Sequence, residues 1–220
     1  MAAMLDADHS DMTLSAAARF IRPGIADLHA DAITRWKGRY PSLLLATEML
    51  DNPRLTDRIV CEIAGDPLDL EDEELAQSAM FQPIAALITH GVDKVAQITG
   101  MAWHRPTVID WVTWNQLGDL APDMTLQDAR LAINAASEAT RAAAGAPKQS
   151  EDGLTGDDVT QTGHRLLGMW QVSLPVKVAV RLKLFAKTVS SRPHPVAEEF
   201  VHEVTVSMLN ASKEGGADGD

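Results

Sequence analysis

Helical spacing of apolar residues recurs along most of this chain, and it constrains the fold more than any other feature of the sequence. Leu55, Ile59 and Ile63 stand four residues apart, which places them on one face of a helix. Thr125 precedes a second such segment and has Asp128 three residues on, the spacing of a capped helix start. We therefore predict an all-α fold, arranged as a single compact multi-helix domain.

Proline and glycine mark the expected helix ends. Pro106 should open a helix, because the first turn needs no N–H at that position. Pro83 should break or kink the helix expected after the acidic cluster at residues 71–74. His90 stands directly before Gly91, which is typical of a helix C-terminus, where the macrodipole favours a basic residue.

The length of 220 residues suits one sizeable domain. We expect a disordered tail at residues 1–10 and a helical domain at 11–210. Within that domain, residues 145–158 lack apolar periodicity and should form a flexible loop. A second disordered tail is expected at 211–220, because its Gly- and Asp-rich sequence cannot bury apolar area.

Charge and composition exclude several classes of protein. The formal net charge of −12 argues against a nucleic-acid binder, since phosphate binding needs a basic face. The single cysteine, Cys61, cannot form an internal disulfide and fits a reducing compartment. No stretch has the roughly 18 apolar residues of a membrane span. We expect a cytoplasmic protein with no direct membrane insertion; attachment to the inner membrane through a partner stays open.

The candidate catalytic and metal-binding residues all fall short of a complete site. His194, Glu198 and His202 stand four residues apart, but they lack the His-Glu-x-x-His order of zinc proteases. His104 could pair with Asp110, yet no serine or cysteine is placed as a nucleophile. We predict no catalytic, cofactor-binding or metal site and no cofactor.

One segment fits two kinds of structure. From Val176 to Leu184, apolar residues alternate with Lys177, Arg181 and Lys183 and one alanine. Alternation is the strand signal, but no second run could pair with this one. Helix and a short strand at 176–184 both remain open.

Basic residues and tryptophans supply the candidate partner-binding residues. From Val159 to Ala197 the chain has six Lys or Arg residues and no acid, and such separated charge steers protein partners. Trp111 and Trp114 are three residues apart, so one helix face would carry both, either in the core or at an interface. The candidate contacts are Lys177, Arg181, Lys183, Trp111 and Trp114.

The stretch from Gly163 to Leu184 resembles the C-terminal part of the SctK (YscK-like) family of type III secretion accessory proteins. The matching positions are a glycine, an apolar run with a tryptophan, a Leu-Pro pair and an Arg-Leu-x-Leu ending: Gly163, Leu166, Leu167, Trp170, Leu174, Pro175, Arg181, Leu182 and Leu184. Tyr40-Pro41-Ser42, Asn52-Pro53-Arg54-Leu55 and the apolar segment from Ile84 to Val95 also resemble the family.

The resemblance implies a mostly helical, non-catalytic adaptor of the secretion sorting platform. Its expected partners are the cytoplasmic domain of the inner-membrane ring protein SctD and the pod protein SctQ, and the expected role is in virulence or symbiosis. Two alternatives stay open. One is a small helical enzyme or metal-binding accessory subunit based on His194, Glu198 and His202; the other is a helical chaperone for another protein.

Overall fold

The computed structural model describes residues 13–24, 27–28, 33–34, 63, 78, 80–183, 185 and 195–214. Every regular element within these ranges is helical, so the predicted all-α fold is confirmed. A helix over residues 13–21 comes first. It is followed by α5 (Phe81–His90), α6 (Val92–Trp103), α7 (Arg105–Thr113), α8 (Leu117–Leu120), α9 (Leu126–Asn134), α10 (Glu138–Ala144), α11 (Gly156–Ser173), α12 (Val176–Leu182) and α13 (Pro195–Glu214).

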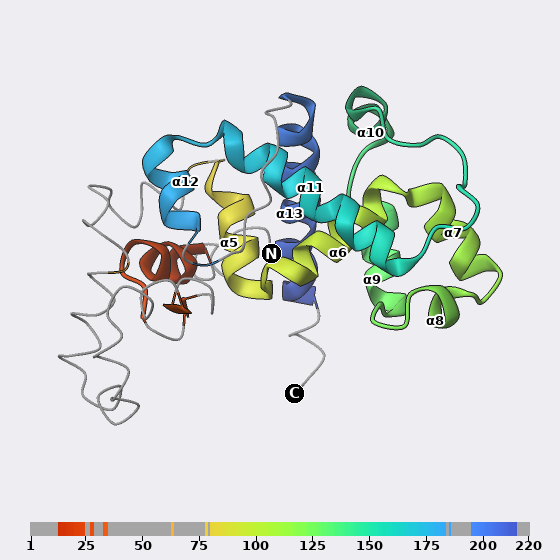
Figure 1. The fold of residues 1–220 in the computed structure, drawn as a ribbon, viewed down its shortest axis with the longest axis horizontal. Helices are drawn as coiled ribbons and strands as arrows, with labels where there is room; N and C mark the ends of the chain where they lie inside the picture. Colours follow the sequence, from red (N-terminus) through yellow and green to blue (C-terminus); the bar gives the residue numbers. More distant parts are fainter. Residues whose placement is uncertain are drawn as a thin grey trace.

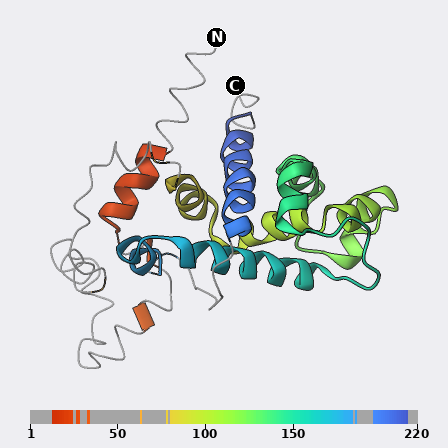
Figure 2. The ribbon, with the colours of Figure 1, turned by 90° about the horizontal axis from the view of Figure 1, so that it is seen from above.

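Helix α11 runs along the long axis of the molecule and connects its two ends (Figure 1). The helix over residues 13–21, α5 and α12 lie at one end, and α7 to α10 lie at the other. Helices α6 and α13 pack against α11, and in Figure 2 α13 stands at a steep angle to α11, on one side of it. None of the helices among the described residues is both long and apolar enough to cross a membrane.

Two glycines let α6 and α11 approach closely. A Cβ atom on Gly163 would stand 1.8 Å from the carbonyl oxygen of Ala96, and one on Gly100 would stand 1.9 Å from that of Val159. Each helix thus presents a glycine to the backbone of the other, and no larger residue fits without moving a helix. The glycine that opens the Gly163–Leu184 stretch therefore has a packing role.

Aromatic contacts join the N-terminal helix to the rest of the core. The ring of Phe20 packs against Phe81 of α5 at 5.8 Å between centroids and against Phe185 at 5.4 Å. In the middle of the molecule, Trp103 of α6 meets Phe200 of α13 edge to face at 5.5 Å. These contacts connect segments far apart in sequence into one hydrophobic core.

The predicted helix ends agree with the structure at several positions. Thr125 and Asp128 form a capping box before α9, and Pro106 lies in the first turn of α7. His90 is the last residue of α5, and Gly91 has a positive φ of 81°. Pro83 lies in the first turn of α5, which a proline tolerates; the helix predicted after residues 71–74, which Pro83 is expected to break or kink, lies outside the described residues.

Some predictions need correction, and others concern residues that the structure does not describe. The segment from Val176 to Leu182 is a helix, so the alternative of a short strand there is wrong. Helix α11 begins at Gly156, inside the loop predicted at 145–158, and α13 continues to Glu214, past the tail boundary at 210. Cys61, Tyr40 to Leu55 and residues 1–10 lie outside the described residues.

Candidate interaction surfaces

Helix α12 exposes an apolar and basic surface, the α12 face, made of Val176, Lys177, Val180 and Lys183. Val176 is 79% exposed and Val180 is 57% exposed. These valines are four residues apart and so share one side of the helix. Lys177 and Lys183 are exposed beside them. Apolar side chains this open to water are a mark of a docking surface when they stand together.

Arg181 does not belong to the α12 face, which corrects its assignment as a surface contact. Its side chain is only 4% exposed, and its Nη2 donates a hydrogen bond to the carbonyl oxygen of Ile21 at 3.2 Å. Val178 and Leu182 are buried on the same side of α12. The alternating apolar residues therefore fall on two sides of the helix: Val178 and Leu182 face the core, whereas Val176 and Val180 face solvent.

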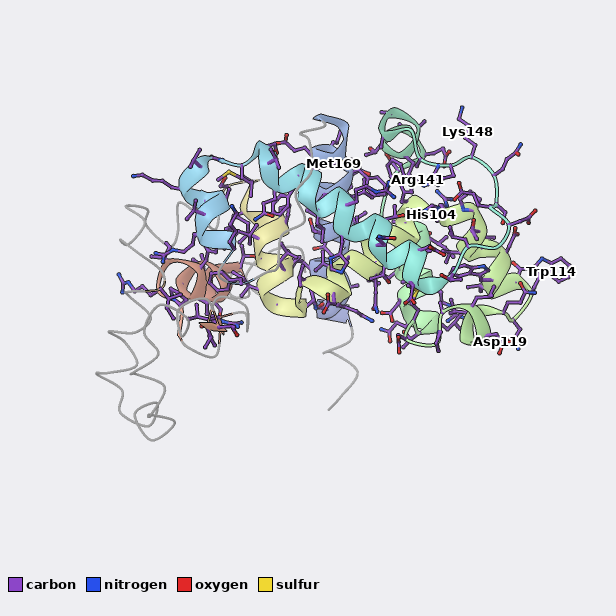
Figure 3. All side chains as sticks on the ribbon, in the orientation of Figure 1. His104, Trp114, Asp119, Arg141, Lys148 and Met169 are labelled. Carbon is purple, nitrogen blue, oxygen red and sulfur yellow. The ribbon has the colours of Figure 1, made fainter. Side chains whose placement is uncertain are left out.

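Trp111 and Trp114 do not share a face, which corrects a second prediction. Helix α7 ends at Thr113, so Trp114 lies beyond the regular helix. Trp111 is buried in the core, whereas Trp114 is 71% exposed. The next residue, Asn115, has a φ of 55°, in the left-handed region that asparagine tolerates. This turn carries the indole of Trp114 outward at the tip of the molecule (Figure 3).

The segment of the chain that carries Trp114 is acidic and contains no Lys or Arg. From Pro106 to Asp128 the chain has four aspartates and no Lys or Arg. Asp110 precedes Trp114 by one helical turn, and Asp119 lies at the same end of the molecule (Figure 3). We call Trp114, Asp110 and Asp119 the Trp114 surface. It lies at the opposite end of α11 from the α12 face, and its charge is opposite.

A buried polar cluster around His104 shows the closest approach to catalytic geometry among the described residues. His104 lies between α6 and α7; its Nε2 is 3.2 Å from Oγ1 of Thr162, and its Nδ1 is 2.7 Å from Oε2 of Glu151. The Glu151 side chain is partly exposed, and its contact with His104 is an ion pair only when the imidazole is protonated. The order hydroxyl, imidazole, carboxylate is that of a nucleophile with its base.

The hydrogen bonds of Thr162 argue for a structural role of this cluster. Its hydroxyl lies 3.0 Å from the carbonyl oxygen of Asp158, one turn back in α11, as well as 3.2 Å from Nε2 of His104, so the helix carbonyl competes with the imidazole for its proton. Thr162 is also buried within α11. Burial lowers the pKa of His104, although the nearby Glu151 carboxylate opposes this shift. The cluster therefore joins the loop that carries Glu151 to α11.

The sequence pointed to Asp110 as the carboxylate partner of His104, and the structure supplies Glu151 instead. Glu151 is also anchored by its backbone N–H, which donates to Oγ1 of Thr107 at 2.9 Å. Thr155 and Asp158 form a capping box before α11, a spacing that predicts the helix start and hence that Thr162 lies inside a helix. No local pattern indicates the contact with Glu151.

The residues of the metal-binding alternative are only partly described. Glu198 is exposed and His202 is half-buried, with its Nε2 lacking a hydrogen-bond partner, and His194 lies outside the described residues. Within the ranges that the structure covers, no three His, Cys, Asp or Glu side chains gather in a way that could hold a metal ion.

Comparison of the chain with protein-family models, with curated proteins and with solved structures finds no match.

Proposed function

We propose that this protein is a non-catalytic adaptor that joins two proteins in the cytosolic sorting platform of a type III secretion system. One observation carries the proposal: two exposed apolar surfaces of opposite charge, the α12 face and the Trp114 surface, lie at opposite ends of α11 (Figures 1 and 3). Surfaces that differ in charge select different partners. Their separation allows both partners to bind at once.

The resemblance of the Gly163–Leu184 stretch to the SctK family supplies the candidate partners, the cytoplasmic domain of SctD and the pod protein SctQ. The glycine of that stretch packs in the core and its last helix forms the α12 face. The resembling segment thus includes both a packing element and an exposed surface, which supports the adaptor role.

Binding of the two purified partners to single-surface variants tests this function. Val176→Asp places a carboxylate on the α12 face, and Trp114→Asp removes the indole of the Trp114 surface. We expect each variant to lose one partner in a pull-down and to keep the other, since the two surfaces are independent. Gln161→Asp, an added charge at an exposed position of α11, should keep both.

The proposal fails if neither SctD nor SctQ binds the unaltered protein. It also fails if both variants lose the same partner while their circular dichroism spectra and melting temperatures match those of the unaltered protein.

A further inference from the structure

The α12 face has the shape of a site for another helix. Val176 and Val180 lie one turn apart on an exposed helix side, and Lys183 follows at i+7 from Val176, on the same side. Val172, in the last turn of α11, is also exposed. A row of side chains at four-residue spacing forms a ridge, and such a ridge packs between the equivalent side chains of a second helix.

The charge of this region restricts which helix can bind. Lys177 and Lys183 lie beside the valines, and from Val159 to Ala197 the sequence contains no Asp or Glu. A second copy of the α12 face would bring lysines together, which disfavours a symmetric contact. A nucleic acid would leave the valines without an apolar contact. The complementary surface combines apolar residues with carboxylates.

We propose that the α12 face binds an acidic amphipathic helix of a partner protein. Leu- or Ile-type side chains of that helix would cover Val176 and Val180, while Glu or Asp residues on its flank would approach Lys177. This inference deepens the adaptor function proposed above by giving the chemistry of the partner at one of its two surfaces.

Binding of a synthetic helix tests the proposal directly. The probe is a 21-residue fluorescein-labelled peptide of three Glu-Leu-Ala-Glu-Leu-Leu-Glu repeats; the control peptide has lysine in place of every glutamate. By fluorescence anisotropy with the full chain, we expect the acidic peptide to bind at least about tenfold more tightly. Added salt should weaken its binding, because the lysine contacts are exposed.

Variants assign this binding to the α12 face. Val176→Asp should weaken acidic-peptide binding at least about tenfold, and Lys177→Glu at least about threefold. Val176 is largely exposed, so the substitution should leave the melting temperature unchanged. The matched control Leu126→Asp alters an exposed apolar residue of α9, at the other end of the molecule, and should leave peptide binding unchanged.

Three results would overturn the inference: equal affinity for the two peptides, undiminished binding by folded Val176→Asp, or self-association of the chain in analytical ultracentrifugation that Val176→Asp abolishes. These results are separable from failure of the adaptor function. Peptide binding without binding of SctD or SctQ leaves the acidic-helix site standing and rejects the secretion role. If SctQ or SctD binds and Val176→Asp weakens that binding, but the acidic peptide does not bind, the adaptor function stands and the acidic-helix site is rejected.

Discussion

At the scale of single residues, two buried arginines cap helices other than their own. The last carbonyl groups of a helix have no partner within it and need donors from elsewhere when they are buried. Arg141 donates to the carbonyl oxygens of Ala102 and Trp103, the end of α6, each at 3.0 Å. Arg181 does the same for Ile21, the end of the helix over residues 13–21.

Replacing Arg141 tests the importance of this capping. Arg141→Lys keeps the charge but cannot supply the Nε and Nη2 donors together, so buried carbonyl groups lose their partners. We expect the free energy of unfolding to fall by about 1–3 kcal/mol, measured by urea denaturation. Arg105→Lys, at a more exposed arginine whose ion pair with Glu138 spans 3.4 Å, should cost under about 1 kcal/mol. Equal losses would contradict the capping role.

The His104 cluster predicts how stability varies with pH. Burial lowers the pKa of His104 below its ordinary value of about 6.5, so the unfolded chain binds a proton more readily than the folded chain. Stability should be level above that pH and decrease as the pH falls below it. His104→Gln should make this decrease in stability smaller, measured by urea denaturation between pH 7.5 and 5. Part of the decrease should remain, because burial also lowers the pKa of His90.

Glu151→Gln provides the opposite test of the same cluster. The Glu151 carboxylate raises the pKa of His104 and partly offsets the effect of burial. Its removal should lower that pKa further, so the loss of stability should continue to lower pH than in the unaltered protein. A Glu151→Gln profile that matches the profile of the unaltered protein would show that the carboxylate does not act on the imidazole.

At the scale of elements, the crossing of α6 and α11 depends on two glycines. Gly163→Ala and Gly100→Ala would each place a Cβ against a backbone carbonyl, which cannot rotate away. Each should lower the free energy of unfolding by at least about 1–3 kcal/mol. Gly118→Ala in α8, where no atom lies within 4 Å of the added Cβ, should be neutral or stabilising by up to about 1 kcal/mol. Thermal melts of the three variants would compare them directly.

Local signals predicted some elements well and others poorly. The capping box at Thr125 and the proline at position 106 act on adjacent backbone groups, so the sequence alone is enough to place α9 and α7. The alternation of apolar residues from Val176 onward is typical of a strand, yet the same residues also supply helical i, i+4 pairs. Packing against other elements therefore determines which structure forms. In the structure, Val178 and Leu182 are covered by other elements while Val176 and Val180 stay exposed.

At the scale of the whole molecule, burial separates residues that look alike in the sequence. Trp111 and Trp114 have similar neighbours, yet one lies in the core and the other at the tip of the molecule, because α7 ends between them. Arg181 stands among exposed lysines in the sequence but points toward the N-terminal helix, more than a hundred residues away in the chain. Such long-range contacts leave no local pattern, so the candidate surfaces could be predicted only in part.

The position of α11 has a consequence for any pair of bound proteins. Its N-terminal residue, Gly156, packs against Ala121, just after α8, and its C-terminal end leads through Leu174 and Pro175 into α12. An 18-residue helix is about 27 Å long and does not stretch. The helix thus sets a fixed distance between its two ends, close to the width of a small domain. Two proteins bound at those ends would keep this spacing even if their own linkers were mobile.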